Sequence, residues 1–301
     1  MSKGPAASDD QDASPEITVR APVVGTAVTL LSNPTALDGD TGSLALGRDS
    51  IPPPAMINTP AGWPERFTLG RVLGAGATSL VLAAKDEELH RDVAIKLLRT
   101  ELVHDAEARA RFEREAGLTG NLEHPNIAPV YDIGKSEGLA YLVMRQVRGR
   151  PLGGMIRRAR DHGLTEVLPI NDLINIFLKV CDAVSYAHDH GLLHRDIKPD
   201  NILVGDHGEV VLVDWGAAST SNDADPAGTI VGTPHYMAPE RVTGQPASVA
   251  TDVFALGASM FYAFVLRRPL EGLHGEEFWR ERLAGTMLPL TSAEQKRVPR
   301  Q

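Results

Sequence analysis

The residues of this chain best suited to chemistry lie in two short segments of its second half. Residues 194–201 read HRDIKPDN, in which Asp196 is followed by Lys198 and Asn201, and Asp214 lies across a short apolar run. Phosphoryl transfer from a metal-bound nucleotide needs a carboxylate that orients a hydroxyl and accepts its proton, oxygen ligands for Mg²⁺, and a cation for the moving group. The two segments supply all of these groups.

Four further blocks of sequence accompany these segments in a fixed order. They are GAG at residues 74–76, VAIK at 93–96, RFERE at 111–115 and GTPHYMAPE at 232–240. With them, the chain from about Phe67 to about Leu283 resembles the eukaryotic-type serine/threonine protein kinases, in particular their bacterial members. The resemblance implies an α+β fold of two lobes, a small β-rich N-lobe with one helix and a larger, mostly helical C-lobe.

The resemblance and the composition together divide the chain into four parts. Residues 1–62 contain no aromatic side chain and are rich in Pro, Ser, Thr, Asp and Gly. Such a segment buries too little apolar area to offset the ordering of its backbone, so we expect a disordered leader. We expect the kinase N-lobe and hinge at 63–147, the C-lobe at 148–290 and a C-terminal tail at 291–301. The C-lobe is expected to be incomplete, since the chain ends where the family begins its last helices.

The glycine turn is open to two interpretations. Gly74 and Gly76 are present, but Ser79 stands where the family has a third glycine. The residues after the turn are strand-like, whereas a dinucleotide fingerprint requires its glycines to open a helix. An ordinary glycine-rich turn and a hairpin tip over phosphates both remain possible on these residues alone.

The resemblance also implies an ATP site. It assigns to ATP binding Leu73, Gly74, Gly76, Val81, Ala94, Lys96, Met144, Val147, Leu203 and Asp214. Arg145 and Gln146 at the hinge depart from the acid and aromatic that the family usually has there. Because the hinge reads adenine through backbone groups, we expect altered inhibitor preference rather than lost ATP binding.

Lys96 has a predicted partner. A lysine flanked by apolar residues is most often a surface lysine whose stem alone is buried. Residues 102–122, however, have a helical pattern in which Glu115 lies on the same face as Phe112. In the family the equivalent glutamate pairs with the strand lysine, so we expect Glu115 rather than Glu113 to bind Lys96.

The resemblance assigns a role to each polar residue of the catalytic segments. Asp196 would accept the hydroxyl proton, and Lys198 would steady the γ-phosphoryl group and favour Ser/Thr over Tyr substrates. Asn201 and Asp214 would bind Mg²⁺ through oxygen atoms. Thr233 would hydrogen-bond to Asp196 and Lys198.

Arg195, directly before the acid, marks kinases of this family that are activated by phosphorylation. A loop arginine needs an anionic partner, which a phosphate between Asp214 and Glu240 would supply. The candidates are Ser219, Thr220, Ser221 and Thr229. Thr229 is favoured because it is nearest to Gly232 and Thr233, which anchor this segment. The alternative is a segment that is ordered without phosphorylation. No arginine follows in the position where the family pairs one with Glu240.

Two hydrophobic helices are predicted to form the C-lobe core. Residues 171–190 are amphipathic, with Cys181 placed on the apolar stripe as a structural thiol. Residues 253–266 are apolar on every face, as in a central buried helix. Asp252 at its start is suited to accept backbone N–H groups of the catalytic loop.

Composition limits the remaining classes of function. The net charge is −9 and there is no long Lys/Arg block, which argues against nucleic-acid binding. The single cysteine excludes an intramolecular disulfide, and no apolar run is long enough to span a membrane. We therefore expect a cytoplasmic protein, attached to a membrane only if the chain continues beyond Gln301.

The predicted function is an ATP- and Mg²⁺-dependent kinase of Ser/Thr residues in proteins, with a homodimer that autophosphorylates its activation segment. The alternative is a pseudokinase-like or truncated scaffold that binds nucleotide and partners with little catalysis.

Overall fold

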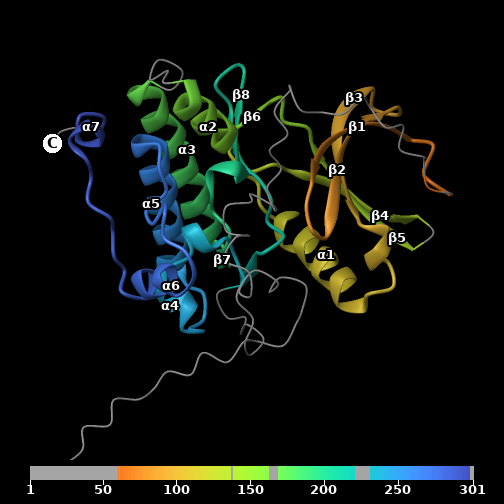
Figure 1. Cartoon of the computed structure of the whole chain (residues 1–301). Coiled ribbons are helices and arrows are strands. Elements are labelled where there is room, and N and C mark those ends of the chain that lie inside the picture. The colour runs from red at the N-terminus through yellow and green to blue at the C-terminus, as the bar shows by residue number, and fades with distance from the viewer. Residues whose placement is uncertain (1–59, 61, 137, 163–168, 221–230, 299–301) are drawn as a thin grey trace, which may run out of the picture.

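The computed structural model describes residues 60, 62–136, 138–162, 169–220 and 231–298. Figure 1 shows two lobes, one built on a β-sheet with a single long helix and the other built mostly of helices. The predicted α+β fold of two lobes is therefore confirmed.

The sheet lobe is a five-stranded antiparallel sheet in the order β1-β2-β3-β5-β4. Its strands are β1 (Phe67–Ala75), β2 (Ser79–Asp86), β3 (Arg91–Leu98), β4 (Val130–Ser136) and β5 (Leu139–Arg145). The central strand β3 is buried from Val93 to Leu98, in keeping with its continuous run of apolar residues around Lys96. Trp63 is also buried, and its ring lies 5.0 Å from that of Tyr141. A folded core thus begins close to the predicted residue 63.

Helix α1 (Ala106–Thr119) packs against this sheet. It begins later than the predicted range of 102–122, because the Asp105 side chain accepts hydrogen bonds from Glu107 N and Ala108 N and caps the helix there. It also ends earlier, at Thr119. Its buried face includes Phe112, Glu115 and Ala116. A glutamate thus faces the interior, which requires a cationic partner.

The helical lobe is built around α3 (Ile170–Asp189) and α5 (Val249–Val265), which pack against each other. The other elements of this lobe are β6 (Gly149–Pro151), α2 (Leu152–His162), β7 (Leu192–Leu193), β8 (Ile202–Gly205), β9 (Val210–Leu212), β10 (Ser219–Thr220), α4 (Pro239–Val242), α6 (Gly275–Leu283) and α7 (Ser292–Gln295). Strand β8 pairs with β6 and β9, and β10 pairs with β7. These short pairs hold the loops that face the sheet lobe.

One prediction about the helical lobe was wrong. Cys181 is exposed, because it shares a helix face with the exposed Ile174 and Leu178 and not with the buried Val180. The predicted central helix is present as α5, which packs on α3 and is largely buried, although Val253 is 55% exposed. Among the helices of the described residues, none has the length and apolar character needed to cross a membrane.

An ion pair joins the segment before β1 to the end of β2. Arg66, just before β1, donates from Nε and Nη2 to the two oxygens of Asp86 at 2.9 and 2.8 Å. Asp86 ends β2 and is fully buried. The hydrogen bonds from Arg66 hold the pKa of Asp86 at about 2, below its ordinary value of 3.8.

We expect the substitution Asp86→Asn to lower the free energy of unfolding in a pH-dependent manner. A depressed folded-state pKa stabilises the fold above pH 3.8, and this contribution is lost as the pH falls to about 2. Urea unfolding of both proteins should therefore give a constant difference near neutral pH that shrinks in acid. The exposed Asp161→Asn serves as the control. A difference that does not change with pH would contradict this role of the pair.

Candidate active site

The catalytic segment forms a compact polar loop between β7 and β8. The Thr233 hydroxyl donates to Asp196 Oδ1 at 2.8 Å, while Lys198 Nζ donates to Asp196 Oδ2 at 2.8 Å and to Thr233 Oγ1 at 3.0 Å. Burial by itself would lower the pKa of Lys198, but the Asp196 carboxylate outweighs it and raises that pKa. The predicted contacts of Thr233 are present, and Thr233 and Lys198 together fix the position of the Asp196 side chain.

Asn201 has the geometry expected of a metal ligand. Its Nδ2 donates to the backbone oxygen of Asp196 at 2.8 Å, which fixes the orientation of the amide. Its Oδ1 is buried and has no hydrogen-bond partner in the described part of the chain. An orphaned buried acceptor is costly in a folded protein and suits an Mg²⁺ ion, which prefers oxygen ligands.

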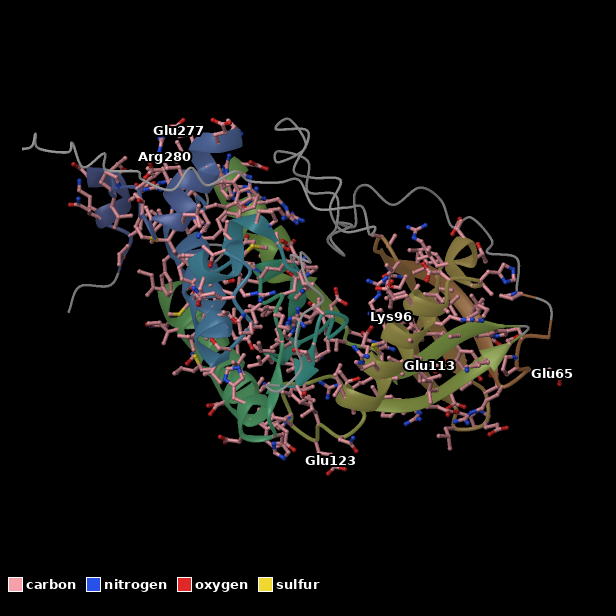
Figure 2. All side chains as sticks on the ribbon, turned by 90° about the horizontal axis from the view of Figure 1, so that it is seen from below. Glu65, Lys96, Glu113, Glu123, Glu277 and Arg280 are labelled. Carbon is pink, nitrogen blue, oxygen red and sulfur yellow. The ribbon has the colours of Figure 1, made fainter. Side chains whose placement is uncertain are left out.

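A cluster of three charged residues, two of them buried, joins the two lobes. Lys96 Nζ of β3 lies 2.6 Å from Glu115 Oε1 of α1 and 3.2 Å from Asp214 Oδ1 of the helical lobe. Burial would lower the pKa of Lys96, but the two carboxylates outweigh it and raise that pKa, and Lys96 in turn lowers the pKa of Asp214. In Figure 2, Lys96 lies on the side of the sheet lobe that faces the helical lobe.

Glu113 takes no part in this cluster. Its carboxylate instead pairs with Lys135 Nζ at 2.7 Å, on the outside of the sheet lobe. Gly216 lies close to the cluster, since a Cβ at that position would be 3.1 Å from Glu115 Oε2 and 3.4 Å from Lys96 Nζ. A glycine two residues after Asp214 thus leaves room for the ion pair.

The backbone of the catalytic loop is hydrogen-bonded to α5, the central helix of the helical lobe. The backbone N–H groups of His194 and Arg195 donate to the two oxygens of Asp252, each at 2.8 Å, as predicted. Arg195 and Asp214 have φ angles of 69° and 64°, in the left-handed region that is unfavourable for non-glycine residues. The surrounding hydrogen bonds must maintain this strain, which is common at functional sites.

His194 packs inside the lobe instead of facing the cleft. Its ring lies 4.5 Å from that of Trp215, and its side chain is buried. Trp215 is part of the same apolar core, so the histidine ring is held in the interior of the helical lobe.

A cavity of about 1030 Å³ lies between the lobes. Its lining includes nine of the ten residues predicted to bind ATP, namely Leu73, Gly76, Val81, Ala94, Lys96, Met144, Val147, Leu203 and Asp214. The tenth, Gly74, is buried in β1 and does not line the cavity. Apolar residues of both lobes therefore form a slot with polar groups at one end, as a nucleotide requires.

The glycine turn joins β1 and β2 as a hairpin. Gly76 N donates to Ser79 O at 2.8 Å, and Arg99 Nε donates to Gly76 O at 2.8 Å. Ser79 itself is 8% exposed. A strand therefore follows the turn, as the sequence predicts, and the hydrogen bond from Arg99, directly after β3, holds the turn in place.

The four candidate phosphorylation sites lie in different settings. Ser219 is buried and pairs with Leu193 in the β10–β7 ladder, and Thr220 is half-buried beside it. Ser221 and Thr229 lie outside the described residues.

Arg282 of α6 was missed by the sequence analysis. It is 2% exposed, donates from Nη2 to His235 O at 2.8 Å, and lies against the rings of Phe254 and Phe278. The carboxylate of Glu240 has no ion pair within the described residues. The segment before Glu240 is therefore held to α6 by a hydrogen bond to its backbone.

The pairing of Arg157 with Asp200 was also missed. Arg157 Nη2 of α2 lies 2.9 Å from Asp200 Oδ1, in the middle of the catalytic loop. A Cβ at Gly153 would clash with the same carboxylate, so the glycine permits the helix to approach. The density of arginines between residues 145 and 160 was the available signal in the sequence.

Comparison with known proteins agrees with this geometry. The family described as "Protein kinase domain" matches residues 67–300. The serine/threonine-protein kinase PknD of Protochlamydia amoebophila is 34% identical over 267 residues, which is 78% of this chain and 26% of that protein. The probable serine/threonine-protein kinase PknB of Corynebacterium glutamicum is 37% identical over 216 residues, 69% of this chain and 32% of that protein.

The chain thus spans about a quarter to a third of the length of the curated relatives it matches. The family match covers both lobes, including β3, α1, the catalytic loop and the GTPHYMAPE segment. The chain belongs to the protein kinase domain family.

Proposed function

We propose that this chain transfers the γ-phosphoryl group of ATP to Ser or Thr hydroxyls of proteins. The observation that carries the proposal is that Lys198 and Thr233 both bind the carboxylate of Asp196. A second cluster, formed by Lys96, Glu115 and Asp214, bridges the two lobes. Positioning and electrostatic stabilisation account for most of the catalysis of this reaction.

Each residue has a role that follows from its contacts. Asp196 accepts the proton of the substrate hydroxyl as the new O–P bond forms and the bond from the γ-phosphorus to the leaving oxygen breaks. Lys198, already bound to Asp196, lies where it can stabilise the charge on the moving group. Lys96, held by Glu115, binds the phosphates that remain on the nucleotide.

Mg²⁺, when bound, neutralises charge on the nucleotide phosphates. Asn201 Oδ1, which lacks a partner in the described residues, and the carboxylate of Asp214 would hold it. ATP would lie in the slot lined by Val81, Ala94 and Leu203.

The alternative of a weakly catalytic scaffold is not favoured, since the relatives are named serine/threonine-protein kinases and Lys96, Asp196, Asn201 and Asp214 are all present. A homodimer and a cytoplasmic location stay predictions.

We expect the substitution Asp196→Asn to lower the rate of phosphate transfer by about 10²- to 10⁴-fold, since the proton acceptor is lost. The measurement is incorporation of radiolabelled phosphate from ATP into a generic protein substrate. The control is Asp189→Asn, which removes an exposed carboxylate at the end of α3. Equal incorporation by Asp196→Asn and the unchanged protein would refute the catalytic assignment.

Activation by phosphorylation is a second testable part of the proposal. Arg195 lines a pocket with Gly232 and Thr233, which belong to the activation segment between Asp214 and Glu240. After incubation with ATP we expect mass spectrometry to find phosphate between residues 217 and 233, and a phosphatase to reduce activity. Arg195→Gln should make activity insensitive to that phosphatase, because the anion would lose its partner. Fully active protein without phosphate in this segment would contradict the proposal.

A further inference from the structure

The lining of the cavity between the lobes carries more positive than negative side chains. Apart from the cluster of Lys96, Glu115 and Asp214, its charged lining residues are six arginines and two aspartates. These are Arg71, Arg145, Arg148, Arg150, Arg157 and Arg158, with Asp161 and Asp206. The whole chain has a net charge of −9, so this concentration of positive charge is local.

Two of these arginines already have acidic partners. Arg148 pairs with Asp92 of the sheet lobe, and Arg157 pairs with Asp200 of the catalytic loop. The remaining four, Arg71, Arg145, Arg150 and Arg158, have no ion pair within the described part of the chain, and we call them the arginine rim. Like charges that line one cavity make its local potential positive, which attracts anions.

Two residues of the arginine rim, Arg150 and Arg158, lie on elements that pack beside the catalytic loop. Helix α2 packs on the short 3₁₀-helix Pro199–Asn201, and the Arg157–Asp200 bond fixes the distance between them. Arg158 is the next residue on α2, and Arg150 lies in β6, which pairs with β8 directly after the loop. Helix α2 and strand β6 lie on the side of the helical lobe that faces the sheet lobe (Figure 1).

Two acids near the catalytic loop already have arginine partners. Asp200 is bound by Arg157, and Glu271 is bound by Arg160 Nη1 at 2.7 Å. Asp161 and Asp206 of the lining have no ion pair within the described residues, but the four arginines of the rim outnumber them, and like charges in proximity select against a basic peptide.

We propose that the arginine rim is a substrate-selecting site that favours Ser or Thr acceptors flanked by acidic residues. The inference rests on the proposed kinase function and names its substrate class. Guanidinium groups bind carboxylates through paired hydrogen bonds, which makes arginine well suited to this recognition.

The test compares three synthetic peptides that share one threonine and differ only in two flanking residues, which are Asp, Ala or Lys. We expect kcat/KM to be highest for the Asp peptide, mainly through a lower KM. Rising salt should reduce the ratio of the Asp to the Ala peptide, since exposed charges are screened.

The variant Arg150→Gln/Arg158→Gln should lower that ratio about tenfold, as expected when two charge-assisted contacts are lost. The charge-reversing Arg150→Glu/Arg158→Glu should shift the preference to the Lys peptide. The control Arg111→Gln/Arg114→Gln makes the same change of charge on exposed α1 positions outside the cavity and should leave the ratio unaltered.

The outcomes separate the two proposals. No transfer to any peptide by the unchanged protein would refute the kinase function itself. Transfer to all three peptides with equal kcat/KM would refute substrate selection by the arginine rim but not the kinase function. An Asp-to-Ala peptide ratio that is unchanged in both rim variants would have the same meaning. If the rim variants change KM for ATP but not the peptide ratio, the arginines serve the nucleotide and the inference is wrong.

Discussion

The site depends on one buried cation. Lys96 is enclosed by the sheet, and an ammonium group taken out of water is tolerated only beside compensating charge. Glu115 and Asp214 supply that charge from two other elements, one in each lobe. The position of α1 on the sheet and the approach of the helical lobe are therefore coupled to a single ion-pair cluster. Any movement that separates the lobes must leave part of this cluster uncompensated.

A second constraint holds the catalytic loop. Two backbone N–H groups of the loop bind the buried carboxylate of Asp252, whose helix is the core of the lobe. This anchoring permits the unfavourable φ angle of Arg195 and presents Asp196 to Lys198 and Thr233. Strain in the loop is thus sustained by the packing of α3 and α5, well away from the reacting groups.

Charge also distinguishes the outer part of the cleft from its interior. Inside, Lys96 and Lys198 are each matched by carboxylates, whereas at the mouth the arginines outnumber the aspartates. Pairing of Arg157 with Asp200 removes a negative charge from the loop and leaves Arg150 and Arg158 to define the surface. The matched interior suits a bound nucleotide, and the unmatched mouth suits an anionic segment arriving from solution.

Much of this could be read from the sequence, because the polar residues of the loop and the glutamate of α1 lie at short, regular spacings. The resemblance to protein kinases that these residues carry implied the two lobes and the ATP slot. Local patterns were insufficient for Cys181, whose exposure depends on which face of α3 meets α5, and for the start of α1, which depends on one cap at Asp105. The Arg157–Asp200 and Arg282–His235 contacts join residues far apart in the chain. Only the tertiary structure decided them, since an arginine side chain has many rotamers and its partner is set by packing between elements.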